Sequence, residues 1–399
     1  MSATTIVAPR DIAEAADAVR EALAARHVVL ATGKNSKRSW TRVPERVDVE
    51  LSTRALTGIV AYEPGDGVIT ALAGTPWSDL ERAVSVHGHH LSPWIADAEG
   101  ASVGGVVAAG QSGADRLRFG PVRHQVLGLC VIDGEGRIVK SGGRLVKNVT
   151  GFDLHRLHTG AHGTLGLISE VSLRLHAAPE LRAIGMAFAP TREAALATAR
   201  VTLARSRSVW TVLVGDMIAD EAPGRRWAIA VLSAGLAEAV EADVRQLRDV
   251  AQELPWQIGE PGTASETRVL GAWRGMGMLE GLSPTLRVSC APSRLDAVLT
   301  AFDAAAAPSE LEVRTCIQPG LGCFSAWIRD VDASAVARIT TDLGRARASV
   351  HWRGLDDALR SQVDLFGPTE PAGLALMRRL KTSLDPRGTF AAGRLAGGL

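Results

Sequence analysis

The sequence has few cysteines, almost no net charge and no long apolar run. The four cysteines are Cys130, Cys290, Cys316 and Cys323. They show neither the close pairing of a metal knuckle nor the density of a disulfide framework, so we expect reduced structural thiols. The 44 basic residues nearly balance the 43 acidic ones, which leaves no long-range field to attract nucleic acid or an anionic membrane. An anionic ligand would have to be captured locally.

The sequence also shows no pattern typical of a membrane-spanning or secretory segment. No stretch approaches the roughly 18 uninterrupted apolar residues of a membrane span. Residues 1–30 mix acidic charges with apolar residues and end without a small-residue cleavage signal, so no secretory peptide is predicted. The chain has 399 residues, of which 46% are hydrophobic and 22% charged. We therefore expect a cytoplasmic globular protein of two or three domains.

The first part of the chain mixes helix and strand patterns. Apolar residues recur with helical spacing from Ile12 to Leu23, and Asp11 stands where a helix N-cap is expected. Residues 28–32 indicate a buried strand, and two β-rich arms around Gly134–Gly136 predict a hairpin. Strands joined both by hairpins and by helices predict an α+β architecture with at least one mixed or antiparallel sheet.

A change of pattern occurs at about Pro179, where the glycine-dense loops nearly vanish. The order strand, helix, strand, strand, helix then occurs twice, once in 182–254 and once in 286–348. This repetition predicts a ferredoxin-like unit used twice, or two halves of one larger sheet. A last helix from about 371 precedes a glycine-rich tail.

Two clusters of glycine stand out in the first part. The first, Gly100 to Gly113, is "GASVGGVVAAGQSG", and the second, Thr159 to Val171, is "TGAHGTLGLISEV". Glycine is expected where backbone approaches a ligand closely, although the first run could equally be a small-residue helix packed on a sheet. The second cluster precedes a strand, so it is not the dinucleotide fingerprint of a nicotinamide-linked enzyme. Together the clusters favour one extended ligand lying across the domain.

These clusters, the run "GGRLVKNVTGFD" and the tail "LMRRLKTSLDPRGTFAAGRL" resemble a known family. It is the vanillyl-alcohol oxidase / p-cresol methylhydroxylase superfamily and, within it, the second FAD-binding subunits of bacterial glycolate oxidases. The resemblance implies FAD in an extended pose between two α+β subdomains at 1–178. It also implies an α+β, ferredoxin-like cap domain at 179–370 that covers the flavin, and a C-terminal segment, 371–399, that returns to the FAD-binding domain.

The resemblance aligns the loop after the strand at 28–32 with the family's pyrophosphate loop. The implied residues are Thr32, Gly33, Lys34, Asn35, Ser36 and Lys37. Lys34 and Asn35 replace two glycines of the family pattern. Asn35 tolerates a left-handed backbone, whereas Lys34 would be strained at positive φ. The alternative interpretation is a basic surface turn between strands.

Other cofactor-binding positions follow from the same resemblance. Those implied to line the pyrophosphate and the flavin edge are Ala101, Ser102, Gly104, Gly105, Ser112 and Gly113. Backbone contacts are implied for Gly163, Thr164, Gly166, Leu167 and Ile168, and Lys147 and Asn148 match the family run. That run has a structural alternative, because Asp153 can cap a short helix after it.

Catalytic and metal-binding residues are not predicted. Nine of the ten histidines precede residue 180, and only His351 lies in the cap region. Related flavoprotein dehydrogenases for D-2-hydroxy acids carry a cluster of histidines and acids in the cap, where a base must reach the substrate. This cap has no such pair of histidines and no tyrosine, since Tyr62 is the only tyrosine. His155 and His158, three residues apart, are interpreted as core or solvated histidines.

The resemblance and the missing cap cluster together imply a function. We expect an FAD-binding subunit of a glycolate or D-2-hydroxy-acid dehydrogenase complex, which oxidises a small hydroxy acid and passes electrons to an iron–sulfur partner. A second FAD-binding subunit would be the catalytic one, and any membrane association would run through such partners. The alternatives are a stand-alone FAD-dependent oxidoreductase acting on a hydroxy acid or another alcohol, and a cofactor-poor scaffold subunit.

Overall fold

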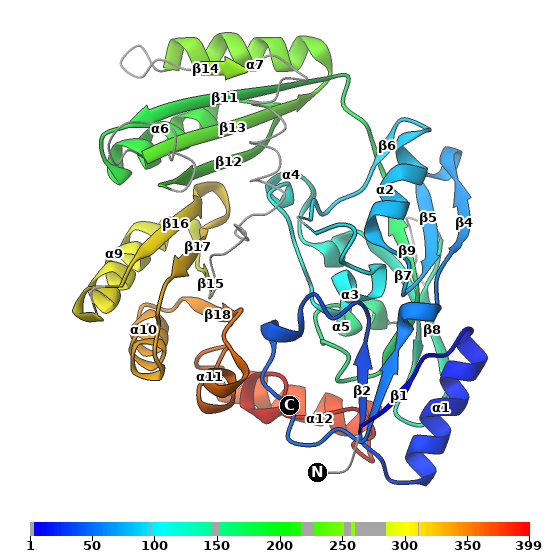
Figure 1. Ribbon diagram of the computed structural model, residues 1–399. Coiled ribbons are helices and arrows are strands. Elements are labelled where there is room, and N and C mark those ends of the chain that lie inside the picture. Colours follow the sequence, from blue (N-terminus) through cyan, green and yellow to red (C-terminus); the bar gives the residue numbers. More distant parts are fainter. Residues whose placement is uncertain are drawn as a thin grey trace. The chain divides into compact units, whose positions relative to one another are not determined.

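The structure is a computed structural model that describes residues 4–95, 97–144, 152–216, 227–250, 257–259, 285–309 and 311–399 (Figure 1). The chain divides into two compact units. Unit 1 comprises Met1–Ser112, Gly120–Ala177 and Thr369–Leu399, and unit 2 comprises Gly113–Phe119 and Ala178–Pro368. Helices and sheets occur in both units, which confirms the α+β class. The sequence pattern did not indicate that the short segment Gly113–Phe119 belongs with unit 2.

Unit 1 begins with a three-stranded parallel sheet in the order β1-β3-β2. Its strands are β1 (Thr5–Val7), β2 (Val29–Thr32) and β3 (Val49–Ser52). Helix α1 (Ile12–Ala24) shares one buried core with β2 and β3. Asp11 caps α1 as predicted, because its carboxylate accepts a hydrogen bond from Glu14 N at 2.8 Å.

A five-stranded antiparallel sheet forms most of the rest of unit 1, in the order β4-β5-β9-β7-β8. The strands are β4 (Ile59–Glu63), β5 (Val68–Leu72), β7 (Val126–Ile132), β8 (Ile138–Gly142) and β9 (Leu167–Arg174). Helices α2 (Trp77–Ser85) and α3 (Val103–Ala108) pack with it in a second core. The predicted hairpin is confirmed as β7–β8. Unit 1 also contains the paired β6 (His89–His90) and β10 (His176–Ala177), and α5 (Leu154–His158).

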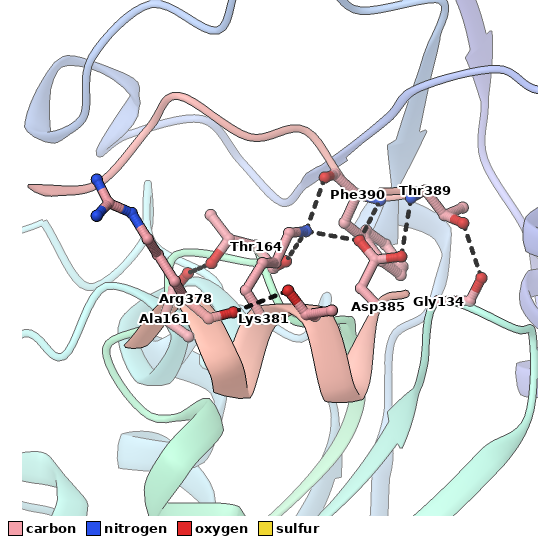
Figure 2. A network of polar contacts seen from close by, with 9 residues as sticks. Gly134, Ala161, Thr164, Arg378, Lys381, Asp385, Thr389 and Phe390 are labelled. Atoms are coloured by element: carbon pink, nitrogen blue, oxygen red, sulfur yellow. Dashed lines mark hydrogen bonds and ion pairs between the residues drawn. The ribbon is translucent and has the colours of Figure 1, made fainter. Parts of the chain in front are cut away.

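The end of the chain is fastened to unit 1 by a buried polar network, shown in Figure 2. Lys381, on helix α12 (Pro371–Leu384), donates to Asp385 Oδ2 at 2.5 Å and to Thr164 O at 2.6 Å. Asp385, whose side chain is fully buried, accepts from Thr389 N at 2.8 Å and Phe390 N at 2.9 Å. The segment after α12 is thereby held beside β2, where Ala391 N donates to Val29 O at 2.8 Å.

Unit 2 is built on one eight-stranded sheet, in the order β14-β11-β13-β12-β16-β17-β15-β18. The strands are β11 (Leu181–Ala189), β12 (Val209–Gly215), β13 (Trp227–Gly235), β14 (Gln257–Gly259), β15 (Thr285–Ser289), β16 (Val313–Gln318), β17 (Cys323–Ile328) and β18 (Ser349–Arg353). The described helices of unit 2 are α4 (Arg116–Phe119), α6 (Arg192–Arg205), α7 (Ala237–Val250), α9 (Leu295–Ala306), α10 (Ala333–Arg345) and α11 (Asp357–Gln362).

Both alternatives predicted for this region occur together. Within each half, the strand order follows that of a β-α-β-β-α-β unit, β14-β11-β13-β12 in one and β16-β17-β15-β18 in the other. The halves join edge to edge, because β12 pairs with β16 through Val214↔Ile317 and Gly215↔Cys316. A Cβ atom at Gly215 would lie 2.5 Å from Thr315 O, so this junction requires glycine.

Candidate functional site

A pocket in unit 1 gathers three segments that are far apart in the sequence. They are the loop after β2, the start of α3, and the turn that leads into β9. The predicted residues that line it are Thr32, Gly33, Lys34, Asn35, Ser36, Lys37, Ser102, Gly104, Gly105, Gly163, Gly166, Leu167 and Ile168. The structure therefore brings most of the predicted cofactor-binding positions to one place.

The loop after β2 has a backbone suited to an anion. Among the described non-glycine residues, Asn35 has a positive φ of 62° and Lys34 does not, so the strain expected at Lys34 does not arise. Within the described part of the chain, the backbone N–H groups of Lys34, Asn35 and Ser36 donate to no protein acceptor. Successive N–H groups of this kind form a concave nest that binds phosphate oxygens.

Neighbouring side chains hold this loop in shape. Glu50 on β3 accepts hydrogen bonds from Thr32 Oγ1 at 3.0 Å and from Asn35 Nδ2 at 3.2 Å. Thr53 Oγ1 donates to Thr32 O at 3.2 Å, and Arg54 Nε donates to Gly33 O at 3.2 Å. These contacts satisfy the side chains of Thr32 and Asn35 and the carbonyls of Thr32 and Gly33. The N–H groups at 34–36 are left for a ligand.

The glycines at the start of α3 serve two different purposes. A Cβ at Gly104 would lie 2.6 Å from Ala73 Cβ, so Gly104 allows tight packing on the protein, as the structural alternative held. A Cβ at Gly105 would meet only Ser102 Oγ, at 3.0 Å, and would otherwise enter open space. Ser102 Oγ caps α3 by accepting from Gly105 N at 3.3 Å. Gly105 is thus the position at which a side chain would obstruct the pocket.

The turn before β9 is closed by the C-terminal tail. His162 and Gly163 have φ values of 52° and 75°, and a Cβ at Gly163 would lie 3.0 Å from Ala31 Cβ. Arg394, only 9% exposed, donates through Nη1 to His162 O and through Nη2 to Thr41 Oγ1 at 3.3 Å. The tail therefore brings a buried cation to the pocket.

The sequence-based prediction missed several residues of the pocket. They include Arg38, Glu50, Thr53, His162 and Arg394. The tail motif "AAGRL", quoted above for its resemblance, was the available signal for Arg394. Glu50 gave no signal, because a single acidic residue in a strand pattern is common. The pocket contains the cations of Lys34, Lys37, Arg38 and Arg394 against the one carboxylate of Glu50, so its charge favours an anion.

Several predicted residues do not line the pocket. Ala101 is 1% exposed and belongs to the core around α2 and α3. Thr164 is buried, and its carbonyl accepts from Lys381. Ser112 and Gly113 lie where the chain passes from unit 1 to unit 2. Lys147 and Asn148 lie outside the described residues.

The residues around α5 test two predictions, that Asp153 caps this helix and that His155 and His158 are core or solvated histidines. Asp153 occupies the N-cap position of α5 but makes no capping hydrogen bond, and it forms an ion pair with Arg156 instead, at 3.2 Å. His155 and His158 are buried, which confirms the interpretation as core histidines. Burial lowers the pKa of both rings and takes that of His158 to about 4, so His158 is neutral at pH 7. Among the described residues, no group of three or more His, Cys, Asp or Glu could hold a metal ion.

The fold and the pocket are those of a protein class that binds a phosphate-bearing cofactor. Such proteins hold the phosphates with a nest of backbone N–H groups and with cationic side chains. Residues 3–142 match a family described as an FAD binding domain. The fold agrees with that of alkyldihydroxyacetonephosphate synthase, with a TM-score of 0.72 at 14% identity over 96% of this chain and 76% of the other. Residues 3–142 thus form an FAD-binding domain, and FAD is the cofactor that this domain indicates.

Curated relatives match parts of the chain. Glycolate oxidase subunit GlcE of Escherichia coli is 38% identical over 39% of this chain and 45% of its own length. Mitochondrial D-lactate dehydrogenase [cytochrome] 1 of Saccharomyces cerevisiae is 30% identical over 41% of this chain and 27% of its own length. The chain therefore spans less than half the length of each of these two relatives. An FAD-linked oxidoreductase of Mycobacterium tuberculosis is 24% identical over 92% of this chain and 85% of its own length.

The residues of the pocket fit FAD. The cofactor carries a pyrophosphate, and the open N–H groups at 34–36 with Lys37 and Arg38 supply donors and positive charge for it. Open space beside Gly105 leaves room for close approach of the ligand. No described helix is both long enough and apolar enough to cross a membrane.

Proposed function

We propose that this chain is an FAD-binding subunit of a dehydrogenase for glycolate or another D-2-hydroxy acid, with the cofactor held in the pocket of unit 1. The observation that supports it most is the convergence of the loop after β2, the start of α3 and the turn before β9 on one cationic pocket. The names of the partial relatives, a glycolate oxidase subunit and a D-lactate dehydrogenase, support a hydroxy acid as the substrate class.

The residues of the pocket have distinct roles in this proposal. Backbone N–H groups at 34–36 and the cations of Lys37 and Arg38 would hold the pyrophosphate, and Arg394 would fix the turn at His162. Thr32 and Asn35 would be kept in place by Glu50. When bound, FAD would supply the chain with redox chemistry, that is, the capacity to take up and pass on electrons.

No cluster of candidate bases occurs in the described part of unit 2, which supports a division of labour between subunits. His351 is the only histidine of unit 2, and the described part of the chain has no group of three or more metal-ligating side chains. A general base must lie within hydrogen-bond reach of the hydroxyl that it deprotonates. We therefore propose that a second flavoprotein subunit performs the oxidation and that an iron–sulfur subunit takes the electrons. The positive φ of Asn35, together with the unstrained backbone at Lys34, favours FAD binding over a cofactor-poor scaffold.

Two measurements on the purified chain test these proposals. The visible flavin absorbance should persist after gel filtration, and its loss would contradict the cofactor site. Anaerobic addition of glycolate or D-lactate to the isolated, FAD-loaded chain should leave this absorbance unchanged. Rapid bleaching would instead favour a stand-alone oxidoreductase. Co-purification of a second flavoprotein and an iron–sulfur subunit from the native host would then be the expected result for the complex.

A further inference from the structure

One half of the sheet in unit 2 has two chemically different faces. Side chains of successive strand residues alternate between faces. On one face Val288, Phe324 and Val350, from three neighbouring strands, belong to the core that also contains residues of α9 and α10. The opposite face carries polar and charged residues on the same strands. Packing in the hydrophobic core therefore explains the residues of the first face but not the polar residues of the second.

Sheet register places these polar residues side by side. Arg287 on β15 is paired with Ser325 on β17 and with His351 on β18. Ser325 is paired in turn with Cys316 on β16. Directly opposed residues of antiparallel strands have Cβ atoms about 5 Å apart. Arg287 thus lies in the middle of a polar row that crosses four strands.

Arg287 has only weak, neutral partners. Its guanidinium contacts Ser325 Oγ at 3.4 Å, Gln318 Oε1 at 3.5 Å and Cys323 Sγ at 3.5 Å. Ser325, Gln318 and Cys323 are each 2% exposed. Distances of this size are at the outer limit of hydrogen bonding. Within the part of unit 2 that the structure describes, no carboxylate forms an ion pair with Arg287.

A second arginine reaches the same place from a distant part of the sequence. Gln318 Nε2 donates to Ala114 O at 3.3 Å, which fastens the segment Gly113–Phe119 against β16. Arg116, in that segment, also lacks an ion pair with any described carboxylate. Burial and the nearby charge of Arg287 lower the pKa of Arg116. The two guanidinium groups therefore share one environment.

Arg353 on β18 adds to the positive charge. Its strand lies beside Arg287, and its Nε donates to His351 Nδ1 at 3.2 Å. Burial and the charge of Arg287 lower the pKa of Arg353 to about 9, so it remains charged at pH 7. The charge of Arg287 thus acts on both Arg116 and Arg353.

Such an arrangement is costly without an anion. Charges removed from water need an opposite charge or strong hydrogen bonds, and like charges brought together repel. Arg192 on α6 shows how such a charge is usually compensated. Its guanidinium donates two hydrogen bonds to the carboxylate of Asp303, at 3.0 and 2.5 Å. Arg287 and Arg116 have no such acid in the described part of the chain. A ligand that carries the negative charge would supply what they lack.

We propose that Arg287 and Arg116, with the hydroxyl of Ser325, form a binding site in unit 2 for the carboxylate of a small organic acid. Guanidinium groups bind carboxylates through two parallel N–H···O bonds, which fixes both position and orientation. The choice of a carboxylate over other anions rests on the proposed function, in which the complex that contains this chain acts on a hydroxy acid. Arg353 would strengthen the site through its charge.

Oxalate is a suitable probe, because it is a dicarboxylate without an oxidisable carbon–hydrogen bond. Calorimetric titration of the FAD-loaded chain with oxalate should show saturable binding, weakened about tenfold or more by Arg287→Gln and by Arg116→Gln. Arg192→Gln is the matched control, since it removes a paired arginine of the same unit, and should leave oxalate binding unchanged. Equal binding by wild type and both site variants would overturn the proposal, as would phosphate binding with no oxalate binding.

Thermal unfolding separates a binding role from a structural one. Without oxalate, Arg287→Gln should leave the unfolding temperature unchanged or raise it, because a repelled cation is removed. Arg192→Gln should lower it, because an ion pair is lost. Oxalate should stabilise the wild type and not Arg287→Gln. A large destabilisation by Arg287→Gln that Arg287→Lys reverses, with oxalate binding intact in Arg287→Lys, would identify a structural cation and overturn the site.

This test stands apart from that of the proposed function. If oxalate binding depends on Arg287 but the chain is found without hydroxy-acid partners or activity, the carboxylate site holds and the proposed function fails. If the complex oxidises a hydroxy acid while Arg287→Gln and Arg116→Gln bind oxalate normally, the proposed function holds and this site fails.

Discussion

The two units gather positive charge for a ligand in different ways. In unit 1 the donors are backbone N–H groups at 34–36, held by a turn at Asn35. In unit 2 they are the guanidinium groups of Arg287 and Arg116, which come from separate segments. A backbone nest requires glycine or asparagine at fixed positions and so leaves a pattern in the sequence. Side chains that only the sheet register brings together leave no such pattern.

The largest expected effect concerns the polar network of Lys381 and Asp385, which holds the C-terminal tail beside the pocket of unit 1. Asp385→Ala should leave the buried ammonium of Lys381 without its counter-ion and lower the free energy of unfolding by about 3–5 kcal/mol. Urea unfolding of the variant and the wild type measures this. Asp364→Asn, at an exposed acid of unit 2, is the control and should change stability little, because asparagine keeps an oxygen that can accept from Phe366 N. Wild-type stability in Asp385→Ala would mean that the network in Figure 2 does not fasten the tail.

Blocking the backbone site itself comes next. Gly105→Trp should abolish retention of FAD, because a side chain there enters the pocket beyond Ser102 Oγ. Flavin absorbance after gel filtration is the measurement. Gly65→Trp provides a matched control, since Gly65 has open space around it and lies outside the pocket lining. Normal flavin retention by a folded Gly105→Trp protein would remove the assignment of this pocket.

Acid should destabilise unit 1 through His158. Its pKa is lowered by burial to about 4 in the folded chain, against about 6.5 when unfolded. The unfolded chain therefore binds more protons between these values, and the stability is present above pH 6.5 and is lost as pH falls toward 4. Urea midpoints at pH 7 and pH 5 should differ less in His158→Gln than in the wild type. An unchanged pH dependence would exclude His158 as the cause.

The smallest effect separates the backbone of the loop from its side chains. Asn35→Val should weaken stability or FAD binding by about 1–2 kcal/mol, because a β-branched residue is strained at a φ of 62°. Asn35→Gly should retain FAD, since glycine adopts this conformation and the N–H group remains. Fluorescence titration with FAD compares the two. Equal binding by the valine and glycine variants would show that the nest does not depend on this turn.

Local physics made part of the molecule predictable from sequence. Asp11 caps α1, the hairpin β7–β8 forms around Gly134–Gly136, and Asn35, which stands where the family pattern has a glycine, takes a left-handed conformation. Each depends on residues near one another in the chain. The alternation of apolar residues likewise predicted two α+β halves in 179–370, which join in one sheet.

Contacts between distant residues were not predictable in this way. Gly104 and Gly105 belong to one glycine cluster and both line the pocket, yet a Cβ atom would meet Ala73 at Gly104 and, apart from Ser102 Oγ, open space at Gly105. Glu50 supports the loop from a neighbouring strand, and Arg394 arrives from the tail, 232 residues after His162. A single sequence does not show which of two neighbouring glycines has open space where a side chain would lie.

The sequence by itself determined where the backbone turns and which elements form, because caps, positive-φ turns and apolar periodicity are set by neighbouring residues. Only the tertiary structure decided which side chains meet. Arg287, Arg116 and Gln318 are brought together by strand pairing and by the segment Gly113–Phe119. Their contacts depend on register and on packing between distant segments, which no local preference encodes.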